Sequence, residues 1–290
     1  MAKRVNTRFL IVLTVCVGIA LIALLAMNYV FFRKDPAAQA RAGDALMQEG
    51  KPREALERYK FAMAHKPTDK ELLVKVGDAY NAMVVDDTQN LGQARAMWNQ
   101  AVANDPRFEP ALDRLLDSYW QQLEASSGDA ELYNRVRETA QRLADVRPAD
   151  LGVAAKVHIA TIRPWLDGLS QVFKRNDVDN SVKALVGLMP RDRGNAEIPY
   201  YVALARLKAA QEKRRGDAEG NAEADRLTAD AAAVMDAGLN EQSNNAAMQL
   251  RAYQVYSTVE QIDRARAAQA RRAAQPAGAA GGGKSAVAAK

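Results

Sequence analysis

The sequence is poor in the side chains that build metal and redox sites: it has one cysteine, Cys16, and two histidines, His65 and His158, in 290 residues. A single cysteine excludes an intrachain disulfide, a zinc–thiolate centre and a Cys-x-x-Cys redox pair within one chain. The two histidines lie far apart and lack metal-ligand spacing. We therefore expect no metal site. We interpret His158 as a packed structural histidine, because no acid or nucleophile accompanies it at helical spacing.

Signatures of catalysis are also missing. The chain contains no Gly-x-Ser-x-Gly elbow and no His-Glu-x-x-His pair, and its Gly-Gly-Gly run at 281–283 lies in a tail without a strand before it. Asp86 and Asp87 are adjacent carboxylates, but they fall in an expected turn where no apolar pocket would raise a pKa. The sequence therefore predicts no catalytic residues, no bound cofactor and no enzymatic activity.

The net charge of +5 and the isoelectric point near 9.2 come from the two ends of the chain. Residues 1–34 carry five basic residues and no acidic one, and residues 264–290 carry six and none, which leaves 29 basic residues against all 35 acidic ones between them. The basic cluster near the C-terminus has no interleaved aromatic residues that could stack on bases. We therefore expect no nucleic-acid partner.

Residues 9–32 form an uncharged apolar run of 24 residues behind a basic tail, residues 1–8. At 1.5 Å per residue a helix of this length would measure about 36 Å, enough to cross roughly 30 Å of hydrocarbon. A cleaved signal peptide is the alternative, but the run is longer than a usual hydrophobic region, and cleavage after Ala23 or Ala26 would place a leucine where a small residue is needed. We therefore predict a retained transmembrane helix over 9–32.

Basic residues flank both ends of this run, so they do not decide its orientation. A short basic tail is hard to translocate, whereas a large C-terminal domain crosses largely regardless of its charge. We predict a single-pass protein of a bacterial inner membrane, with a cytoplasmic N-terminus and a periplasmic C-terminal body.

Two segments that follow share one template. Each closes with a proline preceded at fixed spacing by a small, an aromatic and a small residue, as in Ala55-x3-Tyr59-x2-Ala62-x4-Pro67 and Ala94-x3-Trp98-x2-Ala101-x4-Pro106. Gly43 and Gly77 take equivalent positions upstream. In these features the sequence resembles the tetratricopeptide repeat (TPR) family, whose 34-residue unit is a helix-turn-helix with small residues where helices cross. The resemblance implies an all-α solenoid of stacked helix pairs.

The spacing of the units varies. Pro67 and Pro106 are 39 residues apart, and the surplus over 34 predicts an insertion in the turn near residues 84–88, where extra length is tolerated best. Thr68-x-x-Glu71 predicts a capping box at the start of the second unit. A third unit closes with Val136-x3-Ala140-x2-Leu143-x4-Pro148, but Leu116 replaces the usual glycine, which predicts a wider helix crossing.

These observations divide the chain into six segments. We expect a basic tail over 1–8, a transmembrane helix over 9–32, a linker over 33–40, TPR-like repeats over 41–150, a degenerate TPR-like or other helical extension over 151–274, and a disordered Ala/Gly/Pro tail over 275–290. The extension departs from the template at Arg163-Pro164-Trp165. The tail has no packing residue larger than valine, which is typical of disorder.

The resemblance to the TPR family also implies a place for a ligand, because these superhelices bind peptides on the concave face lined by the first helix of each repeat. By position, that face would expose Asp44, Met47, Gln48, Lys75, Asp78, Asn81, Asp113, Arg114, Asp117 and Trp120. The Lys and Asn clamp with which some members hold a terminal carboxylate is replaced here by Ala40, Asp44, Val74 and Asp78. We therefore expect a neutral or cationic peptide as the partner.

Taken together, these features favour a membrane-anchored scaffold that recruits or organises a protein partner. The alternative is the anchor and adaptor portion of a larger enzyme or envelope assembly machine, whose catalytic part lies beyond residue 290 or in a partner subunit. Homo-oligomerisation through the exposed end of the superhelix is a third alternative.

Overall fold

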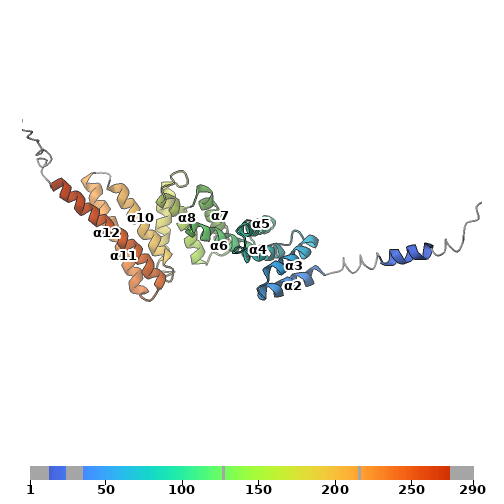
Figure 1. The fold of residues 1–290 in the computed structure, drawn as a ribbon. Helices are drawn as coiled ribbons and strands as arrows, with labels where there is room; N and C mark the ends of the chain where they lie inside the picture. Colours follow the sequence, from blue (N-terminus) through green and yellow to red (C-terminus); the bar gives the residue numbers. More distant parts are fainter. Residues whose placement is uncertain (1–12, 24–34, 126–127, 215–216, 275–290) are drawn as a thin grey trace, which may run out of the picture. The chain divides into compact units, whose positions relative to one another are not determined.

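The computed structural model describes residues 13–23, 35–125, 128–214 and 217–274, and all regular secondary structure in these ranges is helical (Figure 1). The expected all-α fold is thus confirmed for the described part of the chain. Its labelled helices are α2 (Pro36–Gln48), α3 (Pro52–His65), α4 (Lys70–Asn81), α5 (Gln89–Asn104), α6 (Glu109–Ala125), α7 (Ala130–Val146), α8 (Leu151–Leu166), α9 (Arg175–Leu188), α10 (Glu197–Lys213), α11 (Ala218–Glu241) and α12 (Ala246–Ala274).

The helices belong to two compact units, Met1–Leu115 and Leu116–Lys290, so the division falls within α6. In the first unit α2 packs on α3, α3 on α4 and α4 on α5. In the second, α7 packs on α8, α8 on α9 and α10 on α11. Each helix thus lies mainly against its neighbours in sequence, which is the packing of a solenoid. The predicted tail over 275–290 lies outside the described residues.

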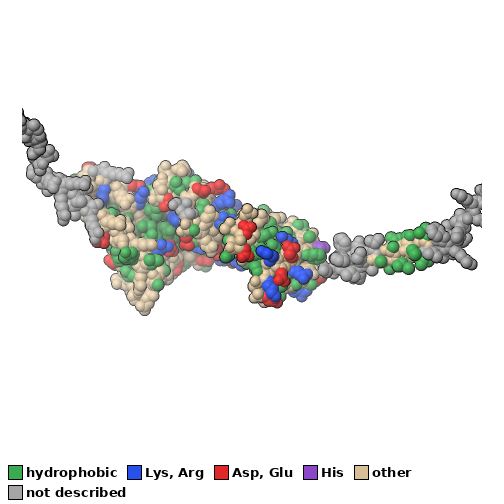
Figure 2. All heavy atoms as spheres, viewed as in Figure 1, with side chains coloured by type: hydrophobic (Ala, Val, Ile, Leu, Met, Phe, Trp, Pro, Cys, Tyr) green, Lys and Arg blue, Asp and Glu red, His purple; other side chains and the backbone are tan. Residues whose placement is uncertain are grey.

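The predicted transmembrane helix and the predicted membrane localisation are not upheld. Residues 9–12 and 24–32 of that segment lie outside the described residues, and residues 13–23 form a helix whose surface is mainly hydrophobic (Figure 2). Among the described residues no helix is both long and apolar enough to cross a membrane. The predicted single-pass localisation is therefore wrong.

Aspartates mark where several helices begin. Asp35 accepts a hydrogen bond from the backbone N–H of Ala37 at 3.0 Å, and Pro36 occupies the first helical position. For this reason α2 starts inside the predicted linker over 33–40. Asp69 caps α4 through the N–H groups of Glu71 and Leu72, one residue after the predicted cap Thr68.

The turns absorb the extra length, as the spacing of the prolines predicts. Helix α4 ends at Asn81 and α5 begins at Gln89, so the insertion expected near residues 84–88 lies between the two helices of the second repeat. Val85 in this turn is 98% exposed, whereas Met83 before it is buried in the core of the first unit. The insertion therefore changes the repeat length without disturbing the packing of α4 on α5.

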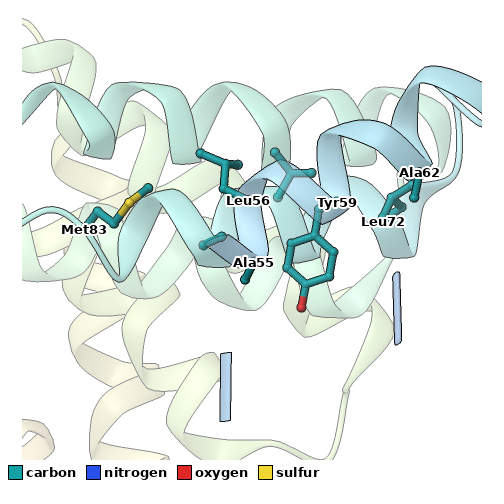
Figure 3. Packing of buried hydrophobic residues seen from close by; sticks show 8 residues of the cluster. Ala55, Leu56, Tyr59, Ala62, Leu72 and Met83 are labelled. Atoms are coloured by element: carbon teal, nitrogen blue, oxygen red, sulfur yellow. The ribbon is translucent and has the colours of Figure 1, made fainter. Parts of the chain in front are cut away.

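The glycines of the template accommodate the aromatic residues in the core of the first unit. A Cβ atom added at Gly43 would lie 2.5 Å from the ring of Tyr59, and one added at Gly77 would lie 2.4 Å from Nε1 of Trp98. Tyr59 belongs to a buried cluster formed by α3, α4 and Met83 in the turn after α4, which Figure 3 shows. The aromatic ring of the second helix thus fills the space left by a missing side chain on the first.

The third repeat solves the same packing problem with different residues. By the template, Leu116 stands where the first two repeats have glycine, and Ala140 stands where they have an aromatic residue. Both are buried, at 1% and 0% exposure. At these template positions the third repeat has a large residue on the first helix and a small one on the second, the reverse of the first two repeats, with a similar combined volume.

The second unit continues the helical stack through the segment where the template fades. Helix α8 continues through the expected departure at Arg163-Pro164-Trp165 to Leu166, although Pro164 lies inside its last turn and lacks the N–H that would bond the carbonyl four residues earlier. Beyond it, α10, α11 and α12 share a buried cluster of mainly small residues: Ala196, Ala203, Leu207, Ala231, Met235, Met248, Ala252 and Val255. The predicted helical extension therefore has its own core.

Candidate functional site

The first helices of the repeats carry the predicted binding residues, and several of these residues bind one another. In the first unit, Nζ of Lys75 on α4 lies 2.7 Å from Oδ2 of Asp44 on α2. The hydroxyl of Tyr59 on α3 donates to Oδ1 of the same carboxylate at 2.9 Å. Asp44 is therefore held by two side chains from two further helices.

The next pair repeats this contact one unit along. The Arg114 guanidinium on α6 donates from Nε to Oδ1 of Asp78 at 3.0 Å and from its second nitrogen to Oδ2 at 3.3 Å. This is a bidentate arrangement, the geometry in which an arginine–carboxylate pair is strongest. The two pairs of the first unit thus connect α2 to α4 and α4 to α6.

A third pair occurs in the second unit, where Nζ of Lys156 on α8 lies 3.5 Å from Oδ1 of Asp117 on α6. The three acids occupy the same template position, directly after Gly43, Gly77 and Leu116. Lys75 and Arg114 each lie three residues before the acid position of their own repeat. We call Asp44–Lys75, Asp78–Arg114 and Asp117–Lys156 the first-helix ion pairs.

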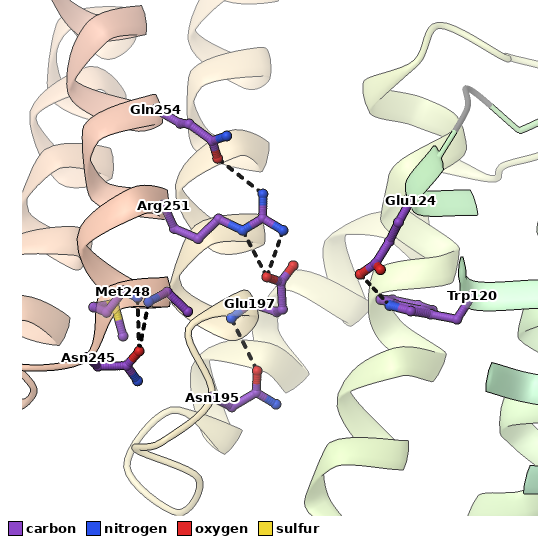
Figure 4. A network of polar contacts seen from close by, with 9 residues as sticks. Trp120, Glu124, Asn195, Glu197, Asn245, Met248, Arg251 and Gln254 are labelled. Atoms are coloured by element: carbon purple, nitrogen blue, oxygen red, sulfur yellow. Dashed lines mark hydrogen bonds and ion pairs between the residues drawn. The ribbon is translucent and has the colours of Figure 1, made fainter. Parts of the chain in front are cut away.

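Trp120 is buried, although the template predicts that it is exposed. It is only 8% exposed, and its Nε1 donates to Glu124 at 2.8 Å (Figure 4). Nζ of Lys156 lies 5.5 Å from the centre of its ring. Met47 likewise packs partly against the buried cluster of the first unit. These two side chains therefore support the helices that carry the face.

The remaining predicted residues are placed differently. Gln48 and Asn81 lie at the surface, and within the described residues neither has a side-chain contact that would occupy its amide. Asp113 is half-buried and engaged in other interactions. The structure thus brings the predicted set onto one series of helices, where two amides stay accessible beside paired charges.

Burial sets the ionisation of the groups near these helices. The pKa of Tyr59 is raised well above its usual value by burial and, second, by its hydrogen bond to Asp44. The pKa of His158 is lowered by burial, and its Nδ1 lies 3.4 Å from Oγ of Ser181. In both cases burial favours the uncharged form of the side chain.

The sequence pattern does not identify two residues of these contacts, Tyr59 and Lys156. The template predicts only a core position for Tyr59, yet its hydroxyl donates a hydrogen bond to Asp44 on α2. Lys156 lies in a segment where the template is weak, and its only signal is its position three residues before Ile159, the fourth-repeat equivalent of the acids.

In the described part of the chain no group of three His, Cys, Asp or Glu residues could hold a metal ion.

Comparison with known proteins places the fold. No protein-family model and no curated protein sequence matches the chain. The crystal structure of YrrB, described as a TPR protein with an unusual peptide-binding site, is similar with a TM-score of 0.50 at 13% identity, over 77% of this chain and 95% of that one.

Two further solved structures show the same type of similarity. MamA reaches a TM-score of 0.49 at 16% identity over 73% of this chain and 93% of its own. TTC0263, a TPR protein of Thermus thermophilus, reaches 0.40 at 15% identity over 77% and 99%. At such low identity the similarity to YrrB bears on the fold alone. The helices described here form a TPR-like α-solenoid.

Proposed function

We propose that this protein is a non-enzymatic scaffold for protein–protein interaction, which binds a peptide segment of a partner on the face formed by its first helices. The TPR-like fold supports this proposal, because solenoids of helix pairs present extended surfaces built from equivalent residues of successive repeats. The first-helix ion pairs support the location, since they connect α2, α4 and α6 into a defined surface in the first unit.

The observation that carries the proposal is the one-to-one pairing of charge. Asp44 and Asp78 are each matched by a base from the following first helix, so these four residues add no net charge to the face. Figure 2 shows acidic and basic side chains interspersed on the visible surface of the first unit. We therefore favour an uncharged peptide segment, and the accessible amides of Gln48 and Asn81 are suited to hydrogen-bond it.

Peptide display against the immobilised full-length chain tests this proposal. Peptides enriched on the wild-type protein should lose binding to the double variant Gln48→Ala/Asn81→Ala. The matched control is Gln93→Ala/Gln100→Ala, which removes two exposed amides from the second helix α5. Equal binding to wild type and to both variants would contradict the assignment to the first helices.

A further inference from the structure

A second polar surface lies in the second unit, where a groove of about 710 Å³ runs between α7, α8 and α9. Helix α8 contributes Val157, His158 and Thr161, which are half-buried or buried, so it forms the floor. Helices α7 and α9 contribute mainly exposed residues and form the walls. The groove is therefore lined by two second helices and the first helix between them.

This groove is separate from the first-helix ion pairs. His158 follows Lys156 by two residues, and two residues of an α-helix turn through about 200°. Lys156 reaches Asp117 on α6, whereas His158 reaches Ser181 on α9. The two residues thus lie on opposite sides of α8, and a ligand of the groove would not touch the first-helix pairs.

The charges of the groove balance within its walls. On α7, Arg142 donates to Glu138 at 2.6 Å and Arg137 donates to Oδ1 of Asn134 at 2.8 Å. Asp177 on α9 adds one carboxylate to the opposite wall. The lining therefore contains two guanidinium groups and two carboxylates, a balance that favours neither an anionic nor a cationic ligand.

The side-chain amides of Asn134 and Gln141 on α7 leave one donor group and one acceptor group for a ligand. The oxygen of Asn134 is taken by Arg137, which leaves its NH₂ group to donate. The NH₂ group of Gln141 donates to Asp145 at 2.9 Å, which leaves its oxygen to accept. The first is thus suited to a backbone C=O and the second to a backbone N–H.

The spacing of these two amides matches an extended chain. Asn134 and Gln141 are seven residues apart on α7, which is about 10.5 Å along the helix axis. Three residues of an extended polypeptide cover about 10 Å. Asn180 on α9 supplies a third, exposed amide from the other wall. An extended chain in the groove could therefore be held along α7 and across from it.

We propose that this groove is a second binding site, which takes an extended, uncharged polypeptide segment through its backbone amides. Asn134 donates to a backbone C=O, Gln141 accepts from a backbone N–H about three residues away, and Asn180 bonds the strand from the opposite side. Among its lining residues there is no Trp, Tyr or Phe ring to stack on a sugar, and the imidazole of His158 is half-buried in the floor. The proposal does not depend on a ligand at the first helices.

The two histidines make the test direct, because the chain has only His65 and His158. Full-length protein labelled with ¹³C at histidine Cε1 gives two NMR signals, which His158→Gln and His65→Gln assign. The probe is an acetylated and amidated Ser-Ala repeat octapeptide, since backbone contacts do not require a particular side chain. The His158 signal should shift saturably with this peptide, and the signal of His65 on α3 should not.

Variants of the wall residues decide the site. Asn134→Ala, Gln141→Ala and Asn180→Ala should each weaken binding about threefold to tenfold, the effect of one lost hydrogen bond. Asn221→Ala, which removes an exposed amide from α11 outside the groove, should leave binding unchanged. Circular dichroism confirms that each variant stays folded.

Three outcomes would overturn the proposal. The first is an unmoved His158 signal up to about 10 mM peptide, a concentration that detects even millimolar dissociation constants. The second is a shift that all three wall variants leave unchanged. The third is a shift with maltotriose, a neutral polyhydroxyl probe, in the absence of one with the peptide. Loss of the first-helix site by Gln48→Ala/Asn81→Ala would leave the His158 titration intact, so the two sites are tested separately.

Discussion

The indole ring of Trp98 lies directly against the backbone of Gly77, so that a Cβ atom at position 77 would stand 2.4 Å from its Nε1. This nitrogen is buried and has no hydrogen-bond partner among the described residues, so packing, and not a polar contact, holds the ring. We expect Gly77→Ala to lower the free energy of unfolding by about 1–3 kcal/mol, because the ring must move. Urea unfolding followed by far-UV circular dichroism measures this loss.

Gly92 is the matched control. It lies in α5, and a Cβ atom there meets nothing within 4 Å. Gly92→Ala should therefore stabilise the protein by up to about 1 kcal/mol, because alanine is the better helix former. Destabilisation by both substitutions to the same degree would contradict this explanation, because helix propensity favours alanine at both positions and Gly92 has no ring to displace.

The third repeat suggests a rescue of the second. It combines Leu116 with Ala140 at the positions of Gly77 and Trp98. We expect Gly77→Leu alone to be severely destabilising, and Gly77→Leu/Trp98→Ala to be more stable than Gly77→Leu, with a coupling energy of about 1–3 kcal/mol. A double-mutant cycle in urea measures the coupling. Simple additivity of the two substitutions would contradict the exchange of volumes between the helices.

Much of the fold could be predicted because helix packing requires prolines and small residues at particular positions of the sequence. Pro67 and Pro106 limit the second helices, and Gly43 and Gly77 predict where the helices cross. The helix boundaries were harder to predict. Asp35 begins α2 within the expected linker, because a cap followed by proline outweighs the general polarity of that stretch.

The apolar run at 9–32 shows the limit of composition as evidence. Hydropathy over 24 residues predicts a span, yet no helix of the described residues meets the length and apolarity that a span needs. Residues 13–23 expose hydrophobic side chains such as Ile19 and Ile22. The apolar composition of such a run therefore does not by itself establish that it crosses a membrane.

The Asp78–Arg114 pair should contribute a small, salt-dependent amount to stability. Its side chains are 29% and 46% exposed, so solvent screens the interaction. A double-mutant cycle of Asp78→Asn and Arg114→Gln should give a coupling energy of about 0.5–1 kcal/mol at low salt, falling at high salt, where the Debye length is about 3 Å at 1 M.

The charge-swapped variant Asp78→Arg/Arg114→Asp provides the control for this pair. It preserves the two opposite charges and should recover part of the stability that either single reversal removes. If both single reversals and the swap were equally stable, the pair would be a surface feature without energetic weight. In that case the neutral face inferred for the first helices would lose its structural basis.

The candidate site was harder to predict than the fold, for a geometric reason. The template places Asp44, Lys75 and Asp78 on one face, but it does not show that a base three residues before one acid meets the acid of the preceding repeat. That contact depends on how successive first helices are offset along their axes. Trp120 illustrates the same limit: its position predicts exposure, yet the side chain is buried, bonds Glu124 within α6 and lies under Nζ of Lys156 from α8.

Tyr133 should make the protein sensitive to alkali. Burial and, second, a hydrogen bond donated to Asp167 raise the pKa of Tyr133 from 10.0 to about 12. The folded state therefore favours the neutral phenol, and this stabilisation is complete below pH 10 and is lost as the pH rises from 10 through 12. We expect Tyr133→Phe to reduce the loss of stability between pH 9 and about 11, measured as the change in urea midpoint. Tyr253→Phe is the control, because that side chain is 70% exposed, and it should keep the wild-type dependence on pH. If Tyr133→Phe followed the wild-type curve throughout this range, deprotonation of Tyr133 would not be coupled to unfolding.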